Sequence, residues 1–338
     1  MSIDLTKQEL LALATTHPEL EKILATTPPK KSFDEQGNDI KTIRVNLAAA
    51  KKALTAATAA TGDVGYVEED RKIPVRDGSR IAIRIHSPKL PPADGCPGLV
   101  VYHGGGFCLG GLDNEVALCR KWTEFGGVAV NVDYRLAPEH PFPIPVEDAY
   151  DALVWTSQHT SNLGINPKKG FVAAGISAGA NFVAVVSHLY RDAGLSPPLT
   201  GQYLSIPTVC DALFIPNEFK DMFLSHDQCK SALVLNQGSL DMFDRLYNAE
   251  ANSPLRSPIL FPSHEGLPSA YLQVCGADPL RDEGLIYEKL LKRNGVKTRL
   301  DIFKGLSHSF WSFWPETDFS RDFQIKTQEG LRWLLEQV

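Results

Sequence analysis

Short apolar runs alternate with amphipathic segments along most of the chain. The apolar runs are Leu99-Val-Val-Tyr, Val128-Ala-Val-Asn-Val, Phe171-Val-Ala-Ala and Tyr271-Leu-Gln-Val, and the strand-like Thr298-Arg-Leu-Asp-Ile-Phe follows them. Such runs are typical of strands buried on both faces of a parallel sheet. Segments with helical periodicity lie between them, at 146–155, 181–190 and 283–293. This alternation predicts an α/β fold with right-handed crossovers and helices on both faces of the sheet.

The segments that precede this pattern are of a different kind. Residues 5–27 carry leucines at helical spacing and predict a helix that is broken near Pro18, and the Ala-, Lys- and Leu-rich residues 41–60 predict a second. A hairpin follows, with Asp77-Gly78 as its tight turn between two alternating segments. The leading helices either cover a functional site or pad the scaffold, and the pattern leaves both open.

One long interval, 207–268, interrupts the strand–helix rhythm. It contains apolar residues at roughly helical spacing, which predict a helical cap inserted between two strands. Most of them should pack in the interior, and Phe214 and Met222 are the two that we consider for substrate contact. We therefore divide the chain into N-terminal helices at 1–60 that contribute to the cap, a core at 61–206, the cap insertion at 207–268, and the rest of the core at 269–338.

Composition narrows the class of protein. The 338 residues carry a net charge of −6, which gives no support for nucleic-acid binding. Six scattered cysteines without a Cys-x-x-Cys pair argue against a metal cluster or a disulfide framework and favour reduced thiols. The polar N-terminus lacks the pattern of a signal peptide, and no apolar run is long enough to span a membrane. We expect a cytoplasmic protein without a bound metal.

The strongest chemical signal is Gly175-Ile-Ser177-Ala-Gly179, which matches Gly-x-Ser-x-Gly. This pattern is known as the nucleophile elbow of α/β-hydrolases. The five residues alone are a weak signal, but a buried-strand run precedes them and a predicted helix follows. A serine on such a turn stands exposed beside a helix N-terminus, which favours developing negative charge.

A second glycine-rich segment, His103-Gly104-Gly105-Gly106, directly follows the first apolar run. Backbone N–H groups of Gly104, Gly105, Gly106 and of Ala178 are candidates for an oxyanion hole, which ester hydrolysis requires. The alternatives are a flexible turn or a phosphate-binding loop, and the latter is disfavoured because no Gly-Lys-Ser/Thr follows. We interpret His103 as a brace for this loop.

The nucleophile needs a base and an orienting acid, which follow it in chain order in this fold. His308 comes after the last predicted strand, whereas His264 precedes every plausible acid. Asp278 lies in the loop after the strand at Tyr271 and is the preferred acid. Asp282 is the alternative, although it and Glu283 are better explained as an N-cap and a first-turn acid of the next helix.

Other residues near these motifs carry weaker signals. Phe107 and Leu109 beside the glycine loop, and Trp311 beside His308, are candidates for a substrate pocket or for core packing. Nothing marks Cys108 as reactive. The proline-rich loop 133–143 is interpreted as bracing at the sheet edge in preference to a second site.

From residue 98 to 311 the chain resembles the hormone-sensitive-lipase family of esterases. The resemblance rests on His103-Gly-Gly-Gly, Tyr134-Arg-Leu-Ala-Pro-Glu-His, Gly175-x-Ser-Ala-Gly, Asp278-Pro-Leu-Arg-Asp-Glu-Gly and His308-x-Phe. It implies an α/β-hydrolase fold with a mostly parallel eight-stranded sheet, a helical cap, and Ser177, Asp278 and His308 as the catalytic triad. It also implies hydrolysis of short- to medium-chain esters without a cofactor, and dimers in some members. Ile176 and Ala180 depart from the family, where Asp and Gly are common.

These observations predict a serine carboxylesterase that forms an acyl-enzyme and acts on a small-molecule ester, and the resemblance to a family with dimeric members makes a homodimer a candidate assembly. Two alternatives stay open. The same triad serves lactone or amide hydrolysis or acyl transfer, and a ligand-binding pseudoenzyme uses the same fold.

Overall fold

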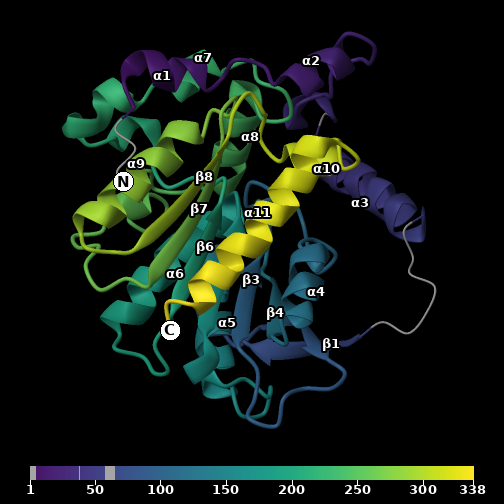
Figure 1. Ribbon diagram of the computed structural model, residues 1–338, viewed down its shortest axis with the longest axis vertical. Coiled ribbons are helices and arrows are strands. Elements are labelled where there is room, and N and C mark those ends of the chain that lie inside the picture. Colours follow the sequence, from purple (N-terminus) through teal and green to yellow (C-terminus); the bar gives the residue numbers. More distant parts are fainter. Residues whose placement is uncertain (1–4, 38, 58–64) are drawn as a thin grey trace.

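A single eight-stranded sheet organises the chain in the computed structural model, which describes residues 5–37, 39–57 and 65–338. The strand order is β1-β2-β4-β3-β5-β6-β7-β8 (Figure 1). The strands are β1 Tyr66–Pro74, β2 Arg80–Pro88, β3 Gly98–Tyr102, β4 Val128–Asp133, β5 Phe171–Ile176, β6 Gly201–Ser205, β7 Ser269–Cys275 and β8 Thr298–Phe303. Strand β2 runs antiparallel to both of its neighbours, and β3 to β8 are parallel.

Alternate residues of the central strands face opposite layers, as the two-residue period of a strand requires. On β3, Leu99 and Val101 belong to one buried cluster, whereas Val100 and Tyr102 belong to another. The first cluster is completed by helices α4 and α11 and the second by α5, α6 and α9. Both faces are therefore covered, which explains why the central strands are mostly apolar.

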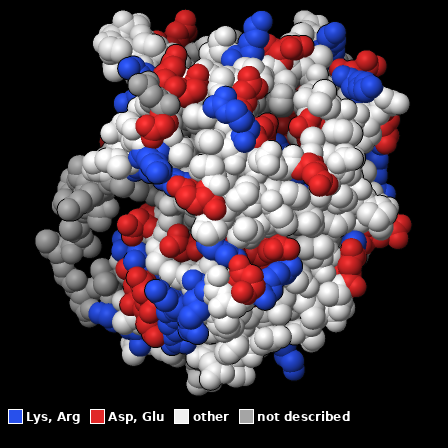
Figure 2. All heavy atoms as spheres, turned by 180° about the vertical axis from the view of Figure 1, so that it is seen from behind, with Lys and Arg blue, Asp and Glu red and all other residues white. Residues whose placement is uncertain are grey.

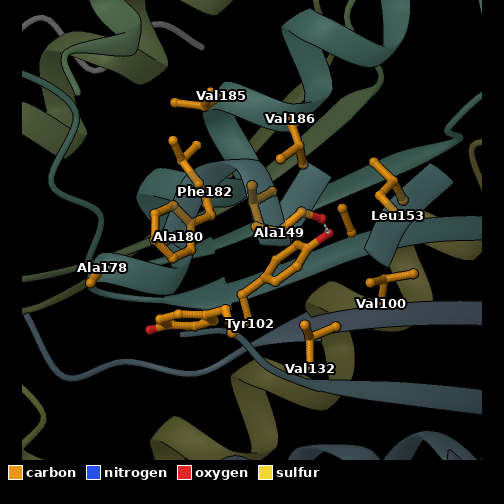
Figure 3. Close-up of a cluster of buried hydrophobic side chains, with 14 of the residues drawn as sticks. Val100, Tyr102, Val132, Ala149, Leu153, Ala178, Ala180, Phe182, Val185 and Val186 are labelled. Atoms are coloured by element: carbon orange, nitrogen blue, oxygen red, sulfur yellow. Dashed lines mark hydrogen bonds between the residues drawn. The ribbon is translucent and has the colours of Figure 1, made fainter. Parts of the chain in front are cut away.

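The helices follow the predicted alternation. Those of the sheet layers are α4 Val116–Glu124, α5 Ile144–Gln158, α6 Ala178–Asp192, α9 Arg281–Arg293 and α11 Asp318–Leu335. Figure 3 shows the core between β3, β4, α5 and α6, where the hydroxyl of Tyr102 donates to the backbone carbonyl of Ala149 at 2.8 Å. The buried hydroxyl of this ring therefore has a hydrogen-bond partner inside the core.

The fold class predicted from the sequence is confirmed, with one strand missed. The hairpin forms as β1 and β2, and each named apolar run forms a strand. Strand β6 escaped notice because Gln202 and Ser205 interrupt its apolar pattern, although both are fully buried. The side-chain amide nitrogen of Gln202 donates to the carbonyl of Pro268 at 3.0 Å, which gives this polar group a partner inside the sheet.

The leading and inserted segments are mostly helical. The former contains α1 Lys7–Ala12, α2 Pro18–Leu24, η1 Phe33–Glu35 and α3 Ile40–Ala57, and the latter η3 Ala212–Phe214, η4 Asn217–Met222, α7 Ser225–Gln228, α8 Gln237–Tyr247 and η5 Pro258–Leu260. Shorter elements elsewhere are η2 Pro167–Lys169 and α10 Phe310–Phe313. As predicted, Pro18 separates two helices, and it begins the second. Residues 58–60 of the second predicted helix lie outside the described residues.

The leading and inserted segments pack on each other. The backbone N–H of Phe33 donates to the carbonyl of Val234, and the ring of Phe33 lies 5.6 Å from that of Phe243 on α8. The hydroxyl of Ser239, also on α8, donates to Asp34 at 2.8 Å. Segments about 200 positions apart in the sequence therefore form one structure.

The molecular surface mixes charges of both signs. Figure 2 shows acidic and basic side chains lying next to each other on the face drawn there. Ion pairs between charged side chains of the described residues include Arg84 with Asp70 and Arg120 with Glu68. Among the described helices, none is long and apolar enough to cross a membrane.

Helix α11 approaches the sheet so closely that it requires glycine at position 330. A Cβ atom there would lie 2.0 Å from the Tyr271 ring, whose hydroxyl is held by Asp301 and the Lys326 carbonyl. In an open helix, Gly to Ala is stabilising by about 1 kcal/mol. We expect Gly330→Ala to lower the free energy of unfolding by about 1–3 kcal/mol instead, because of overpacking. Urea unfolding measures this, with exposed Gln324→Ala as the control, and a more stable Gly330→Ala protein would contradict the packing.

Candidate active site

Ser177 occupies a strained turn between β5 and α6. Its backbone has φ 56° and ψ −117°, a combination that non-glycine residues rarely adopt. The turn is held because the Ser177 N–H donates to the carbonyl of Ser205 at the end of β6, at 2.8 Å. The side chain is 9% exposed and lines a cavity.

The two glycines of the serine motif are required by close backbone contacts. A Cβ at Gly179 would lie 2.0 Å from the carbonyl oxygen of Tyr102, and one at Gly175 would lie 2.2 Å from the carbonyl oxygen of Gly179. The first turn of α6 therefore rests directly on the ends of β3 and β5. This contact brings the residue after β3 and the residue after β5 into one site.

His308 and Asp278 lie beside the serine hydroxyl. The Nε2 atom of His308 is 3.0 Å from Oγ of Ser177, and its Nδ1 atom is 2.7 Å from Oδ2 of Asp278. Asp278 is 1% exposed and His308 is 4% exposed. An ionised carboxylate only accepts, so Nδ1 donates to Asp278 and Nε2 is left to accept from the serine hydroxyl.

The loops that carry Asp278 and His308 are held by local hydrogen bonds and by contacts with the leading segment. The other oxygen of Asp278 accepts the N–H of Leu280 at 2.9 Å. The carbonyl of Leu13 accepts the N–H of Gly305 at 2.7 Å, and a Cβ at Gly276 would lie 2.0 Å from that same carbonyl. Residues 13–17 thus press against both loops, and the two glycines make room for them.

The glycine loop after β3 differs in one respect from its prediction. The N–H of Gly104 donates to Oε1 of Glu115 at 3.3 Å, so it is not free for an oxyanion. For Gly105 and Gly106, the described part of the chain offers no backbone or side-chain acceptor. These two and Ala178, the first residue of α6, are the remaining candidate donors.

His103 braces this loop, in line with its interpretation. Its Nδ1 atom lies 2.9 Å from the carbonyl oxygen of Gly104, and its ring stacks on Tyr134 at 4.1 Å. The Tyr134 hydroxyl in turn donates to the carbonyl of His103 at 2.7 Å. Arg135 of the same proline-rich loop pairs with Asp148 at 2.7 Å. These contacts support the bracing interpretation of residues 133–143.

A cavity of about 1270 Å³ opens above the serine. Phe107, Leu109 and Trp311 line it, as do Ile176, Ser177 and His308. Sequence reasoning did not single out several further lining residues, and no motif marks them: Glu115, Thr208, Phe243, Asp244 and Arg256. Phe243 presses on the glycine loop, since a Cβ at Gly106 would lie 2.4 Å from its ring.

Phe214 and Met222 do not line this cavity, which corrects their selection as candidate contacts. Phe214 is 37% exposed in η3, and Met222 borders a separate small void beside Leu10 and Leu285. The reason is that the first part of the insertion is fixed to α9 and not to the rim of the site.

Asp282 and Glu283 produce that fixation. The predicted N-cap role of one of them is wrong, because Leu280 is the N-cap, whereas the predicted first-turn position is confirmed. Both lie in the first turn of α9, whose N-cap is Leu280. Asp282 accepts the N–H groups of Leu224 and Ser225 at 2.7 Å each. Glu283 accepts those of Val209 and Cys210 at 2.7 and 3.0 Å, and the two carboxylates thereby anchor the insertion to the helix that follows Asp278.

Two further predictions concern reactive groups. Burial raises the pKa of the Cys108 thiol to about 12, which keeps it protonated and unreactive. His264 pairs with buried His188 at 3.0 Å instead of approaching Ser177. Within the described ranges, no group of His, Cys, Asp and Glu side chains is arranged to hold a metal ion.

Comparison with known proteins shows the family of the chain. A family model described as an alpha/beta hydrolase fold matches residues 99–312. An AB hydrolase superfamily protein of Schizosaccharomyces pombe is 40% identical over 271 residues, which are 80% of each chain. The carboxylesterase NlhH of Mycobacterium tuberculosis is 34% identical over 249 residues, 72% of this chain and 76% of its own. The crystal structure of vibralactone cyclase superposes with a TM-score of 0.88 at 32% identity, covering 96% of both chains.

The contact between His226 and Glu283 makes stability depend on pH. Burial opposes the charge of His226, but the hydrogen bond to Glu283 at 3.0 Å, together with the charges of Glu283, Asp278 and Asp282, outweighs burial and raises the pKa above its ordinary value of 6.5. A raised folded-state pKa gives stabilisation that is complete below the unfolded value and is lost as pH rises through the folded one.

We therefore expect His226→Gln to lower the free energy of unfolding more at about pH 5.5 than at about pH 8.5. Urea titrations of both proteins at the two pH values measure the difference. An equal loss at both values, or a larger one in alkali, would show that the ion pair does not form.

Proposed function

The chain belongs to the α/β-hydrolase family and is a hydrolase of the carboxylesterase type, and we propose that it cleaves esters through an acyl-enzyme on Ser177. The observation that carries the proposal is the continuous series of contacts from Asp278 through His308 to the serine hydroxyl, at 2.7 and 3.0 Å. This is the arrangement by which a weak nucleophile is activated.

In the proposed mechanism, His308 takes the proton of Ser177 while the serine oxygen attacks the ester carbonyl. The N–H groups of Gly105, Gly106 and Ala178 stabilise the resulting oxyanion, and each such donor typically contributes about 10²–10³ in rate. His308 then protonates the departing alcohol, and water repeats the sequence on the acyl-enzyme. Asp278 stabilises the imidazolium in both halves of the cycle.

The cavity supports a small-molecule ester as the substrate. Its walls are mostly apolar, with Leu109, Leu235, Leu240 and Phe243 among them, and it is of ample size for short- to medium-chain acyl groups. The segments that we propose as the cap, 1–60 and 207–268, provide Phe33 and Phe243 on one side of it.

A second candidate function is acyl transfer to a hydroxyl group in place of water. It is favoured by the close structural similarity to a protein named for a cyclisation, vibralactone cyclase. In such a reaction a hydroxyl of the substrate attacks the acyl-enzyme and closes a lactone, and the first half of the cycle is unchanged.

Replacing the nucleophile tests the proposal directly. We expect Ser177→Ala to reduce hydrolysis of p-nitrophenyl butyrate by at least about a thousandfold, and to abolish labelling by a fluorophosphonate probe. Ser312→Ala is a matched control, since Ser312 also lines the cavity and should retain both properties. Near-normal turnover by Ser177→Ala would exclude the mechanism, and failure of the wild type to label would favour a non-catalytic binder.

Product analysis separates the two candidate functions. With p-nitrophenyl butyrate in water containing a small fraction of butanol, hydrolysis should give mainly butyric acid. We expect this result because water greatly exceeds butanol in concentration. Butyl butyrate as the dominant product, at butanol concentrations far below that of water, would favour acyl transfer.

A further inference from the structure

A buried arginine lies in the wall of the catalytic cavity. The Arg256 side chain is only 8% exposed and lines the cavity together with Thr208 and Ser177. The backbone of Arg256 is fixed relative to the nucleophile, because the side-chain amide of Asn181, on the first turn of α6, donates to the backbone carbonyls of both Arg256 and Thr208 at 2.8 Å. The triad does not use this cation.

The hydrogen-bonding capacity of Arg256 is only partly used. Among the described residues, its guanidinium donates to one oxygen of Asp244 at 2.9 Å and more weakly to the Thr208 hydroxyl at 3.4 Å. The Phe107 ring also lies nearby, with its centroid 5.7 Å from the guanidinium carbon. A planar guanidinium binds a carboxylate best through two parallel N–H groups, so a single oxygen leaves room for a further acceptor.

The charges around Arg256 are unequally buried. Asp244 lies on α8 with its side chain 48% exposed, so water can solvate it without the arginine. Glu283, the other nearby carboxylate, is committed to the backbone of Val209 and Cys210. Although burial opposes its charge, these two acids raise the pKa of Arg256, which therefore remains a cation. A buried cation needs a partner more than an exposed anion does.

We infer that Arg256 is a specificity residue that binds a carboxylate carried by the ester substrate, in competition with Asp244. The preferred substrates would then be half-esters of dicarboxylic acids, or esters whose alcohol half is a hydroxy acid with a free carboxylate. The apolar part of the molecule would lie against Phe107 and Phe243. This inference rests on the proposed esterase function and adds a substrate class to it.

The competing explanation is that the pair of Arg256 and Asp244 only attaches α8 to the core. In that case loss of either partner would change kcat/KM for neutral and anionic esters to the same degree. Substrate recognition makes the opposite prediction for the two partners: removal of Arg256 lowers the preference for an anionic ester, and removal of the charge on Asp244 raises it.

The experiment compares kcat/KM for two pairs of esters of matched length. One pair places the carboxylate on the acyl half, mono-p-nitrophenyl adipate against p-nitrophenyl hexanoate. The other places it on the alcohol half, 4-carboxybutyl hexanoate against pentyl hexanoate. The enzymes are the wild type, Arg256→Met, Asp244→Asn, and Arg44→Gln as a control. Arg44 also lines the cavity, but its guanidinium is committed to Glu139 and two carbonyls.

We expect the ratio of anionic to neutral kcat/KM to fall about ten- to hundredfold in Arg256→Met for at least one pair, mainly through KM. It should rise in Asp244→Asn and stay unchanged in Arg44→Gln. The pair that responds identifies the half of the ester that faces Arg256. Unchanged ratios in both pairs for Arg256→Met would overturn the inference and assign the residue to attachment of α8.

The neutral esters separate this inference from the proposed function. Hydrolysis of hexanoate esters that requires Ser177, together with unchanged ratios, refutes only the role of Arg256. Absence of Ser177-dependent hydrolysis refutes the esterase itself, and calorimetric binding of monoethyl adipate to Ser177→Ala with and without Arg256→Met then still tests the carboxylate site. Loss of that binding in the double variant supports the inference, and unchanged binding overturns it.

Discussion

The site depends on the approach of the first turn of α6 to the ends of β3 and β5. The Gly179 backbone contacts the Tyr102 carbonyl at a distance that no side chain allows, and the strained Ser177 turn is the geometric result. Because β3 and β5 are adjacent and parallel, this one contact places the glycine loop beside the nucleophile. A strained backbone of this kind persists only where its surroundings over-determine it, and here the Ser205 carbonyl and two glycines do so.

Apart from strand β6, the sequence was sufficient for the fold class and for the three residues brought together at the site, because both follow from local patterns. Apolar runs identify buried strands, and the order of serine, acid and histidine along the chain leaves few choices. The rest depended on long-range contacts. Gly104 looks like its two neighbours in sequence, and only its contact with Glu115 sets it apart. Phe214 and Met222 share the apolar spacing of Phe243, yet only Phe243 reaches the cavity.

The walls of the cavity are anchored to the same elements that carry the catalytic groups. Asn181 joins the nucleophile helix to Thr208 and Arg256, and Glu283 joins the helix after Asp278 to the start of the insertion. Pocket shape and catalytic geometry are therefore mechanically linked. A substitution of Asn181 or Glu283 would therefore alter substrate selection and turnover together.

The carbonyl of Leu13 fits between two glycines, one before the acid and one before the base. Residues 13–17 thus pack against the loops that carry Asp278 and His308, although the described residues before β1 contribute no strand to the sheet. Clipping by a protease between α1 and α2 would relax both loops at once while the eight strands stayed paired. A nicked protein would then keep the circular dichroism signal of its sheet while its turnover falls, so a folded spectrum alone does not report an intact site.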